Sequence, residues 1–259
     1  MKNIKREKLY KSIMTQLITE NIDIPVNSDN IKLKSSIYYT SKTPEKAPFL
    51  LNLPGFLNHR GNYLVKFFTE KFANEGYYVL SYDYRGHGET KKQTGPRWAE
   101  MIPQIFTDLH IVLEWIIQNQ ANRLLKNKIA LFGRSLGGAI ILSHGFIDER
   151  AKLLIALSTR YDYNTIRGRY QTIEDQKGED IIRKISPNSF LRKDPLNNER
   201  ILIAHCKDDD TVPFENLLQI KKHLGLNDEN AIEFDSGGHT FSGKREEIFK
   251  YSLEFLKRL

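Results

Sequence analysis

A serine stands between two glycines in the segment Gly133-Arg134-Ser135-Leu136-Gly137, which has the pattern G-x-S-x-G. The apolar run from Lys128 to Phe132 before it is typical of a buried strand, and the apolar segment from Leu136 to Phe146 after it favours a helix. A G-x-S-x-G at a strand-to-helix turn is the pattern of a nucleophile elbow, where small neighbours leave room for a sharp, strained turn. We therefore predict that Ser135 is a nucleophile.

A serine hydroxyl attacks at neutral pH only with an adjacent base, and the chain has seven histidines. His239 lies in the glycine-rich segment Ser236-Gly237-Gly238-His239, which follows the last apolar run, Ala231 to Phe234. A loop at the end of a parallel strand can bring an imidazole over the sheet. The other histidines lie in expected helices, at a strand end or before the serine, and His87 is expected to be structural. His239 is thus the predicted base.

An imidazole base needs a carboxylate that holds its tautomer and stabilises its protonated form. Asp208-Asp209-Asp210 follows the apolar run from Arg200 to His205 and precedes Thr211-Val212-Pro213. Adjacent carboxylates point in different directions, so only one of them can serve. We expect the other two to belong to a solvated acidic loop.

These three groups must be positioned by a scaffold, and apolar runs alternate with amphipathic segments along the chain. Strands are predicted at residues 31–39, 49–53, 77–82, 128–132, 152–157, 200–205 and 231–234. Helices are predicted at residues 62–75, 105–117, 136–146 and 245–256. Continuously apolar strands separated by helices indicate a mostly parallel sheet that is covered on both faces.

One stretch interrupts this alternation. Residues 159–199 lie between two predicted strands, are polar, and are rich in tyrosine and arginine. Their 41 residues exceed an ordinary crossover loop, so we predict a small lid inserted into a single domain that spans residues 1–259. The tyrosines of this lid are candidate substrate contacts: Tyr161, Tyr163 and Tyr170.

Three segments carry a resemblance to a known family. Asp83-Tyr84-Arg85-Gly86-His87-Gly88 resembles the D-x-R-G-x-G turn of the esterase, monoacylglycerol lipase and serine-aminopeptidase-like branch of the α/β-hydrolase superfamily. The segment from His205 to Pro213 is similar to that branch's H-G-x-x-D-x-x-V-P, and Leu53-Pro54-Gly55-Phe56 is similar to its H-G-F loop. The order serine, aspartate, histidine is also that of the superfamily. The resemblance extends from about residue 20 to the end and implies an α/β-hydrolase fold.

The resemblance also implies roles for individual residues. It aligns the catalytic acid with Asp209, which completes a triad with Ser135 and His239. It places the oxyanion hole at two backbone N–H groups, those of Phe56 and Leu136. Two positions depart from the family pattern, since a proline precedes Gly55 where the branch has histidine, and a cysteine follows His205 where it has glycine.

Composition excludes several other classes of protein. Hydrophobic residues make up 40% of the chain and charged residues 27%, which argues against a disordered chain. The mean hydropathy of -0.49 and the lack of an apolar run near 18 residues argue against a membrane span. The first 20 residues do not read as a signal peptide, so we expect a cytoplasmic protein.

Charge and cysteine content narrow the range of partners. The net charge of +7 is spread along the chain without a basic run interleaved with aromatics, so no nucleic-acid partner is predicted. A lone cysteine, Cys206, excludes an intramolecular disulfide and a cysteine-rich metal site, and no cofactor or metal is predicted. The oligomeric state is not indicated by the sequence.

We therefore expect a serine carboxylesterase that hydrolyses a small-molecule ester, with a short-chain or aryl acyl group, through an acyl-enzyme. The same triad also suits a thioesterase, an acyltransferase or a peptidase. A ligand-binding protein that kept the fold without catalysis is the alternative from another class, because fold alone does not determine function.

Overall fold

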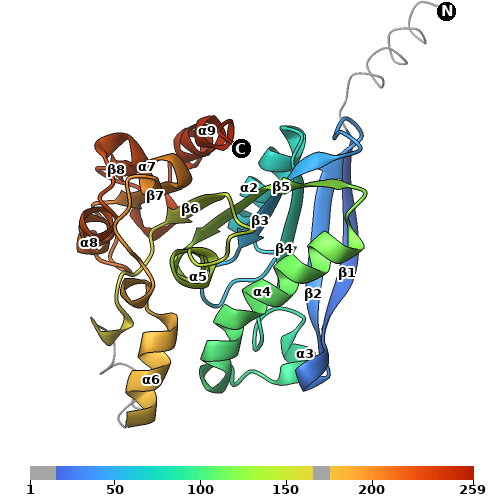
Figure 1. Ribbon diagram of the computed structural model, residues 1–259, viewed down its shortest axis with the longest axis horizontal. Helices are drawn as coiled ribbons and strands as arrows, with labels where there is room; N and C mark the ends of the chain where they lie inside the picture. Colours follow the sequence, from blue (N-terminus) through green and yellow to red (C-terminus); the bar gives the residue numbers. More distant parts are fainter. Residues whose placement is uncertain (1–15, 166–175) are drawn as a thin grey trace, which may run out of the picture.

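The computed structural model describes residues 16–165 and 176–259, which form one sheet with helices on both faces (Figure 1). In these residues the sheet has eight strands in the order β1-β2-β4-β3-β5-β6-β7-β8. The strands are β1 (Leu17–Val26), β2 (Ile31–Thr40), β3 (Ala47–Leu53), β4 (Tyr78–Tyr82), β5 (Leu124–Arg134), β6 (Leu153–Leu157), β7 (Ile201–Cys206) and β8 (Ala231–Phe234). The helices are α2 (Tyr63–Asn74), α3 (Lys91–Thr94), α4 (Ile102–Asn119), α5 (Leu136–Ile140), α6 (Gln176–Ile185), α7 (Asn197–Arg200), α8 (Glu215–Leu224) and α9 (Arg245–Leu256).

In the sheet order β4-β3-β5-β6-β7-β8, neighbouring strands are parallel. The hairpin β1–β2 lies at one edge, where β1 pairs antiparallel with β2 and β2 pairs antiparallel with β4. A parallel arrangement places the carboxyl ends of all these strands at one edge of the sheet, where their following loops meet. The loops after β3, β5, β7 and β8 carry the predicted catalytic and oxyanion-hole residues, and the segment after β6 carries Tyr161 and Tyr163.

An aromatic cluster fixes α2 and α9 to one face of the sheet. Phe132 of β5 packs against Phe68 and Phe72 of α2, with ring centroids 4.8 and 5.1 Å apart. Phe249 of α9 lies 5.0 Å from Phe72. Four aromatic rings thus join two helices to the central strand, which burial of apolar surface stabilises.

The other face of the sheet is covered by α4, α5 and α8. Leu131, the neighbour of Phe132 on β5, faces this side because successive strand residues point to opposite faces. It belongs to the same buried cluster as Leu109 and Leu113 of α4 and Leu217 of α8. The strand carrying the nucleophile elbow is therefore fixed by apolar packing on both faces.

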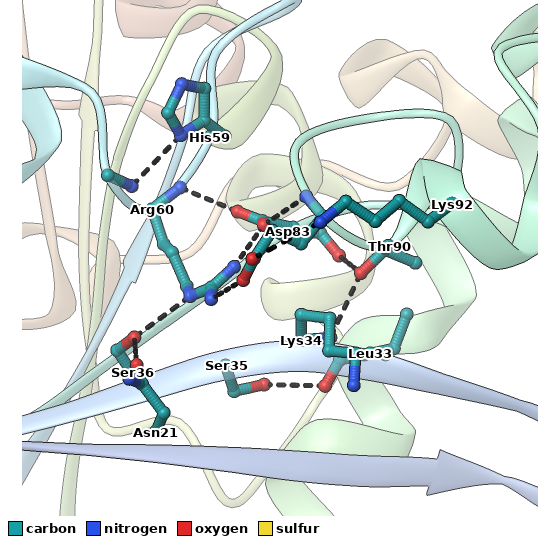
Figure 2. Close-up of polar contacts among 12 residues, drawn as sticks. Asn21, Leu33, Lys34, Ser35, Ser36, His59, Arg60, Asp83, Thr90 and Lys92 are labelled. Carbon is teal, nitrogen blue, oxygen red and sulfur yellow. Dashed lines mark hydrogen bonds and ion pairs between the residues drawn. The ribbon is translucent and has the colours of Figure 1, made fainter.

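A buried carboxylate ties the loop after β3 to the turn after β4 (Figure 2). Asp83 is fully buried and accepts hydrogen bonds from the backbone N–H groups of Arg60 and Glu89, both at 2.8 Å, and from the Arg60 guanidinium. The Thr90 hydroxyl donates to the Asp83 carbonyl at 2.8 Å and accepts from the backbone N–H of Lys34 on β2 at 3.0 Å. Asp83 therefore braces these loops.

Arg85 forms a second buried ion pair two residues further along. Its guanidinium donates two hydrogen bonds to the Asp108 carboxylate of α4, at 2.7 and 2.8 Å, and a third to Asp29 in the β1–β2 turn. The Arg85 and Asp108 side chains are 7% and 1% exposed. The turn after β4 is thus attached to α4 and to the edge hairpin by one guanidinium.

The structure adds to the sequence prediction in two places. Strand β1 was not predicted, although Ile22, Ile24 and Val26 alternate with polar residues as in a half-buried strand. The helix predicted at 136–146 is α-helical only to Ile140 and continues as a π-helical turn over Ile141–Gly145. The described residues contain no helix that is both long and apolar enough to cross a membrane.

We expect Asp108→Asn to lower the free energy of unfolding by about 3–5 kcal/mol, because a neutral amide removes the buried carboxylate and leaves only the partly exposed Asp29 to pair with Arg85. Urea denaturation followed by circular dichroism measures this loss. Asp23→Asn is the matched control, since Asp23 pairs with Lys34 at 2.9 Å on the surface and its loss should cost less than about 1 kcal/mol. Equal losses in the two variants would contradict the role of the buried pair.

Candidate active site

Ser135 occupies a left-handed backbone conformation, with φ 56° and ψ −117°, between β5 and α5. Such a conformation is strained for a residue with a side chain, and it is held by neighbours. The Ser135 N–H donates to the Leu157 carbonyl at 2.8 Å, and the Thr159 hydroxyl donates to the Ser135 carbonyl at 2.8 Å. A side chain at Gly137 would place its Cβ 2.3 Å from the Leu53 carbonyl oxygen, so this turn requires glycine there. These are the features of the predicted elbow.

The Asp209 carboxylate is buried and accepts four hydrogen bonds. Oδ1 accepts the backbone N–H groups of Thr211 and Val212, both at 2.9 Å. Oδ2 accepts His239 Nδ1 at 2.8 Å and His205 Nε2 at 3.0 Å. Burial alone would raise the pKa of Asp209, but the hydrogen bonds from both histidines and from the Val212 N–H hold it well below its usual range. Asp209 is therefore ionised at neutral pH.

His205 is a site residue that the sequence interpretation missed. It lies on β7, is 1% exposed, and its Nε2 is 3.0 Å from Asp209 Oδ2 and 2.9 Å from the Val212 carbonyl oxygen. Both neighbours only accept hydrogen bonds, so Nε2 carries the hydrogen. The signal in the sequence was the four-residue spacing from His205 to Asp209 across the end of the strand.

His239 contacts Asp209 and reaches the same cavity as Ser135. Its Nδ1 donates to Asp209, which leaves Nε2 on the opposite side of the ring as the basic nitrogen. In this structure no hydrogen bond joins Nε2 to Ser135 Oγ. Catalytic hydrogen bonds are often long without a substrate and tighten in the complex.

A cavity of about 250 Å³ brings the predicted residues together, since Ser135, Leu136, Phe56 and His239 all line it. Apolar side chains form most of its wall, among them Trp98, Ile102, Phe106, Ile182, Ile185 and Val212. None of the described residues that line this cavity is an aspartate or a glutamate. The apolar wall from α4 was not predicted, because it comes from a helix that precedes the elbow by about one strand and one turn.

The loop after β3 presents the second predicted oxyanion donor. The Tyr84 hydroxyl donates to the Pro54 carbonyl at 2.8 Å, and the Asn58 side-chain amide donates to the Phe56 carbonyl at 3.1 Å. Within residues 16–165 and 176–259, the N–H groups of Phe56 and Leu136 donate no hydrogen bond. Both donors are thus available at the cavity, and the proline before Gly55 leaves this arrangement possible.

The three candidate tyrosines differ in position. Tyr163 lines the cavity. Tyr161 is not among the residues that line it; its hydroxyl is 2.9 Å from His223 Nδ1 and its N–H donates to the Asn216 side chain at 2.9 Å. Tyr170 lies outside the described residues.

Helix α6 lies in the stretch predicted to be a lid, at the lower left of Figure 1 and apart from the sheet. Its Ile182 and Ile185 are buried and line the cavity. The Lys184 carbonyl lies 3.1 Å from His144 Nε2, and His144 Nδ1 lies 3.1 Å from His110 Nε2 on α4. These contacts attach α6 over the cavity, while the lid's boundaries stay a prediction.

Two other reactive side chains have structural surroundings. His87 lines the cavity, but its Nδ1 is 2.8 Å from the Arg85 carbonyl, and burial lowers its pKa, so the ring is neutral. Burial raises the pKa of the Cys206 thiol to about 12, which keeps it protonated and unreactive. Among the described residues, no group of three or more His, Cys, Asp or Glu side chains could hold a metal ion.

A family model described as serine aminopeptidase S33 matches residues 44–173. An Escherichia coli protein of 31.7 kDa from the traX-finO intergenic region is 30% identical over 129 residues, which are 48% of this chain and 43% of that protein. The chain thus spans less than half the length of this curated relative.

Two solved structures share the fold along nearly the whole chain. An acylaminoacyl peptidase from Pyrococcus horikoshii superposes with a TM-score of 0.73 at 18% identity, covering 97% of this chain and 43% of that one. Est1E from Butyrivibrio proteoclasticus, solved with bound ferulic acid, gives a TM-score of 0.72 at 19% identity, covering 91% and 98%. These matches confirm the predicted α/β-hydrolase fold.

We expect Asp209→Asn to lower kcat by about 10⁴, as the loss of the acid does in the best-studied triad, because the imidazole can then adopt the wrong tautomer. Asp210→Asn is the matched control, since this exposed neighbour bonds only to Thr211 and should leave turnover nearly unchanged. Steady-state hydrolysis of p-nitrophenyl acetate measures both. A greater loss of kcat in Asp210→Asn than in Asp209→Asn would show that Asp209 is not the catalytic acid.

Proposed function

Because the chain belongs to the serine aminopeptidase S33 family of α/β-hydrolases, we propose that it is a serine hydrolase that cleaves carboxylic esters. One observation carries this proposal. Ser135, in a strained left-handed turn, lines the same cavity as His239, and Nδ1 of His239 donates to the buried, ionised Asp209. These are the nucleophile, base and acid that acyl transfer requires.

In the first half of the proposed reaction, Ser135 Oγ attacks the ester carbonyl carbon while His239 Nε2 takes the hydroxyl proton. The carbonyl oxygen becomes an oxyanion that accepts the N–H groups of Phe56 and Leu136. Each such donor contributes about 10²–10³ in rate. The C–O bond to the alcohol then breaks, and His239 returns the proton to the leaving oxygen, which leaves an acyl-Ser135 ester.

The second half repeats these steps with water. His239 removes a proton from a water molecule that attacks the acyl carbon, and the same two N–H groups stabilise the second oxyanion. Collapse breaks the bond to Ser135 Oγ, His239 returns the proton to the serine, and the carboxylic acid leaves. Asp209 keeps Nδ1 of His239 protonated throughout, so that Nε2 is free to accept a proton at both stages.

The cavity supports a short-chain or aryl acyl group. Its volume of about 250 Å³ is below the range of about 300–1,000 Å³ of pockets that enclose drug-sized ligands. Its wall combines aliphatic side chains with Trp98 and Phe106, which suit a compact apolar or aromatic group. The bound ferulic acid in Est1E supports an aryl ester as one such substrate.

The charge of the cavity favours an ester over the N-terminus of a peptide. An aminopeptidase must bind an α-ammonium group, and a buried ammonium needs an opposite charge. The described lining holds Arg134 and Arg160 and no carboxylate. The guanidinium of Arg134, which forms no ion pair among the described residues, favours a neutral or anionic ester over an ammonium group at this wall.

We expect Ser135→Ala to abolish labelling by a fluorophosphonate and to lower p-nitrophenyl acetate turnover by as much as about 10⁶, because no other group replaces the nucleophile. Gel fluorescence and steady-state kinetics measure the two effects, and circular dichroism checks the fold. Ser236→Ala, an exposed serine three residues before His239, is the control and should retain labelling. Labelling of Ser135→Ala at the wild-type rate would eliminate Ser135 as nucleophile.

We expect kcat/KM for p-nitrophenyl esters to be highest at short acyl chains, because a longer chain exceeds the cavity. A series from about two to sixteen carbons, with methyl ferulate alongside, tests this against the size of the pocket. The matched variant Ile182→Ala removes part of the wall on α6 and should move the maximum to longer chains. A wild-type maximum at about ten carbons or more would contradict a compact site.

A further inference from the structure

The loop that carries His239 is held through its backbone by a carboxylate. The N–H groups of Gly237 and Gly238 both donate to the Asp208 carboxylate, at 3.1 and 2.8 Å. Both glycines have positive φ, 137° and 56°, so their N–H groups converge in a way that residues with side chains rarely permit. Successive backbone N–H groups that point at one anion form a nest. Asp208 is exposed, as expected, and it also bonds to the backbone of the loop that carries His239.

A guanidinium also bonds to the backbone of the same loop. Arg134, which directly precedes Ser135, donates from Nη1 to the His239 carbonyl at 3.0 Å. Its side chain also lies against the loop after β3 that carries Gly55 and Phe56, here called the oxyanion loop. A Cβ placed on Gly55 would be 3.0 Å from Arg134 Nη2. One side chain thus touches the histidine loop and the oxyanion loop, while its backbone belongs to the nucleophile elbow.

No ion pair explains the position of Arg134. Among the salt bridges of residues 16–165 and 176–259, none includes it, although its side chain is partly buried and burial lowers its pKa. A cation removed from water without a paired carboxylate carries a desolvation cost. The carbonyl of His239 is the acceptor that offsets this cost, so the guanidinium and the histidine loop fix each other.

We propose that Arg134 and Asp208 are positioning residues, which bond to different backbone groups of the histidine loop and so hold His239 and the oxyanion loop in register with Ser135. The inference rests on the proposed function, because it requires His239 to act as the base on Ser135. Neither side chain takes part in a proton transfer or in bond making. Each acts through the backbone of the loop, where a displacement of about 1 Å can cost about 10² in rate.

Arg134 also lines the cavity, so a direct contact with substrate is the competing explanation. The two roles separate kinetically, since a positioning residue affects kcat and a substrate-binding residue affects KM. A neutral p-nitrophenyl ester reports positioning alone, and an ester with a carboxylate on its acyl group reports any charge contact with the guanidinium.

The experiment compares Arg134→Met, Arg134→Lys and Asp208→Ala with the control Asp210→Ala in the full chain. We measure kcat and KM for the neutral and the anionic ester, the rate of fluorophosphonate labelling, and the melting temperature. Arg134→Met and Asp208→Ala should each lower kcat and the labelling rate by about 10², with KM for the neutral ester unchanged. Arg134→Lys should recover part of the loss because it retains a donor, and Asp210→Ala should behave as wild type.

Two results would overturn the inference. Wild-type kcat and labelling in both Arg134→Met and Asp208→Ala would show that the contacts do not position the histidine. A higher KM for the anionic ester alone, at unchanged kcat, would make Arg134 a substrate contact. If Arg134→Met melts at the assay temperature, the exposed Asp208 decides the question by the same measures. Absence of labelling in the wild type would instead defeat the proposed function, which distinguishes the two failures.

Discussion

The buried carboxylate of Asp209 is the interaction on which the site depends. A charge removed from water must be compensated by hydrogen bonds or by opposite charge, and Asp209 has four donors. They come from His205 at the end of β7, from the N–H groups of Thr211 and Val212 in the loop that follows it, and from His239 after β8. Satisfying one carboxylate therefore fixes the end of β7, its loop and the histidine loop together.

The parallel sheet already brings the segments that meet at Asp209 close together. β7 and β8 are parallel neighbours, so the loops that follow them start from adjacent positions at the same edge. β5 lies two strands from β7 in the same sheet. Its apolar packing on both faces holds the strained conformation of Ser135 in place. Only short, polar loops then need to be arranged, and charged side chains arrange them by bonding to backbone groups rather than by extending secondary structure.

Sequence patterns predicted the parts of this structure that are local. The seven predicted strands all exist, because continuous apolar runs of strand length between turn residues have few other solutions. Ser135, Asp209 and His239 each stood in a short segment with its own pattern, and the structure brings Asp209 and His239 into contact. Strand β1 was missed although its apolar residues alternate with others, because Pro25 stands within the run and a proline argues against a strand.

The contacts that could not be predicted are those that join segments distant in sequence. His205 looked like an ordinary strand residue until β7 and its loop were placed, and the apolar cavity wall of α4 meets α6 only in the folded chain. Arg134 shows the limit most clearly. As the variable residue before the nucleophile it carried no pattern of its own, yet its guanidinium lies where the histidine and oxyanion loops meet.

The same placement bears on the electrostatics of the proposed reaction. Arg134 bonds to the backbone carbonyl of His239 and Asp209 to its imidazole, and the attraction of Asp209 partly offsets the lowering of the Arg134 pKa by burial. In the proposed reaction, the negative charge that develops on the carbonyl oxygen is stabilised by the two backbone N–H groups, and Arg134 acts by holding the loops that present the base and one of these donors. Asp209 meanwhile stabilises the proton that His239 accepts. His239 is thus fixed at its backbone by a cation and at its imidazole by an anion, so that the base is both positioned and polarised for acyl transfer from an ester to serine.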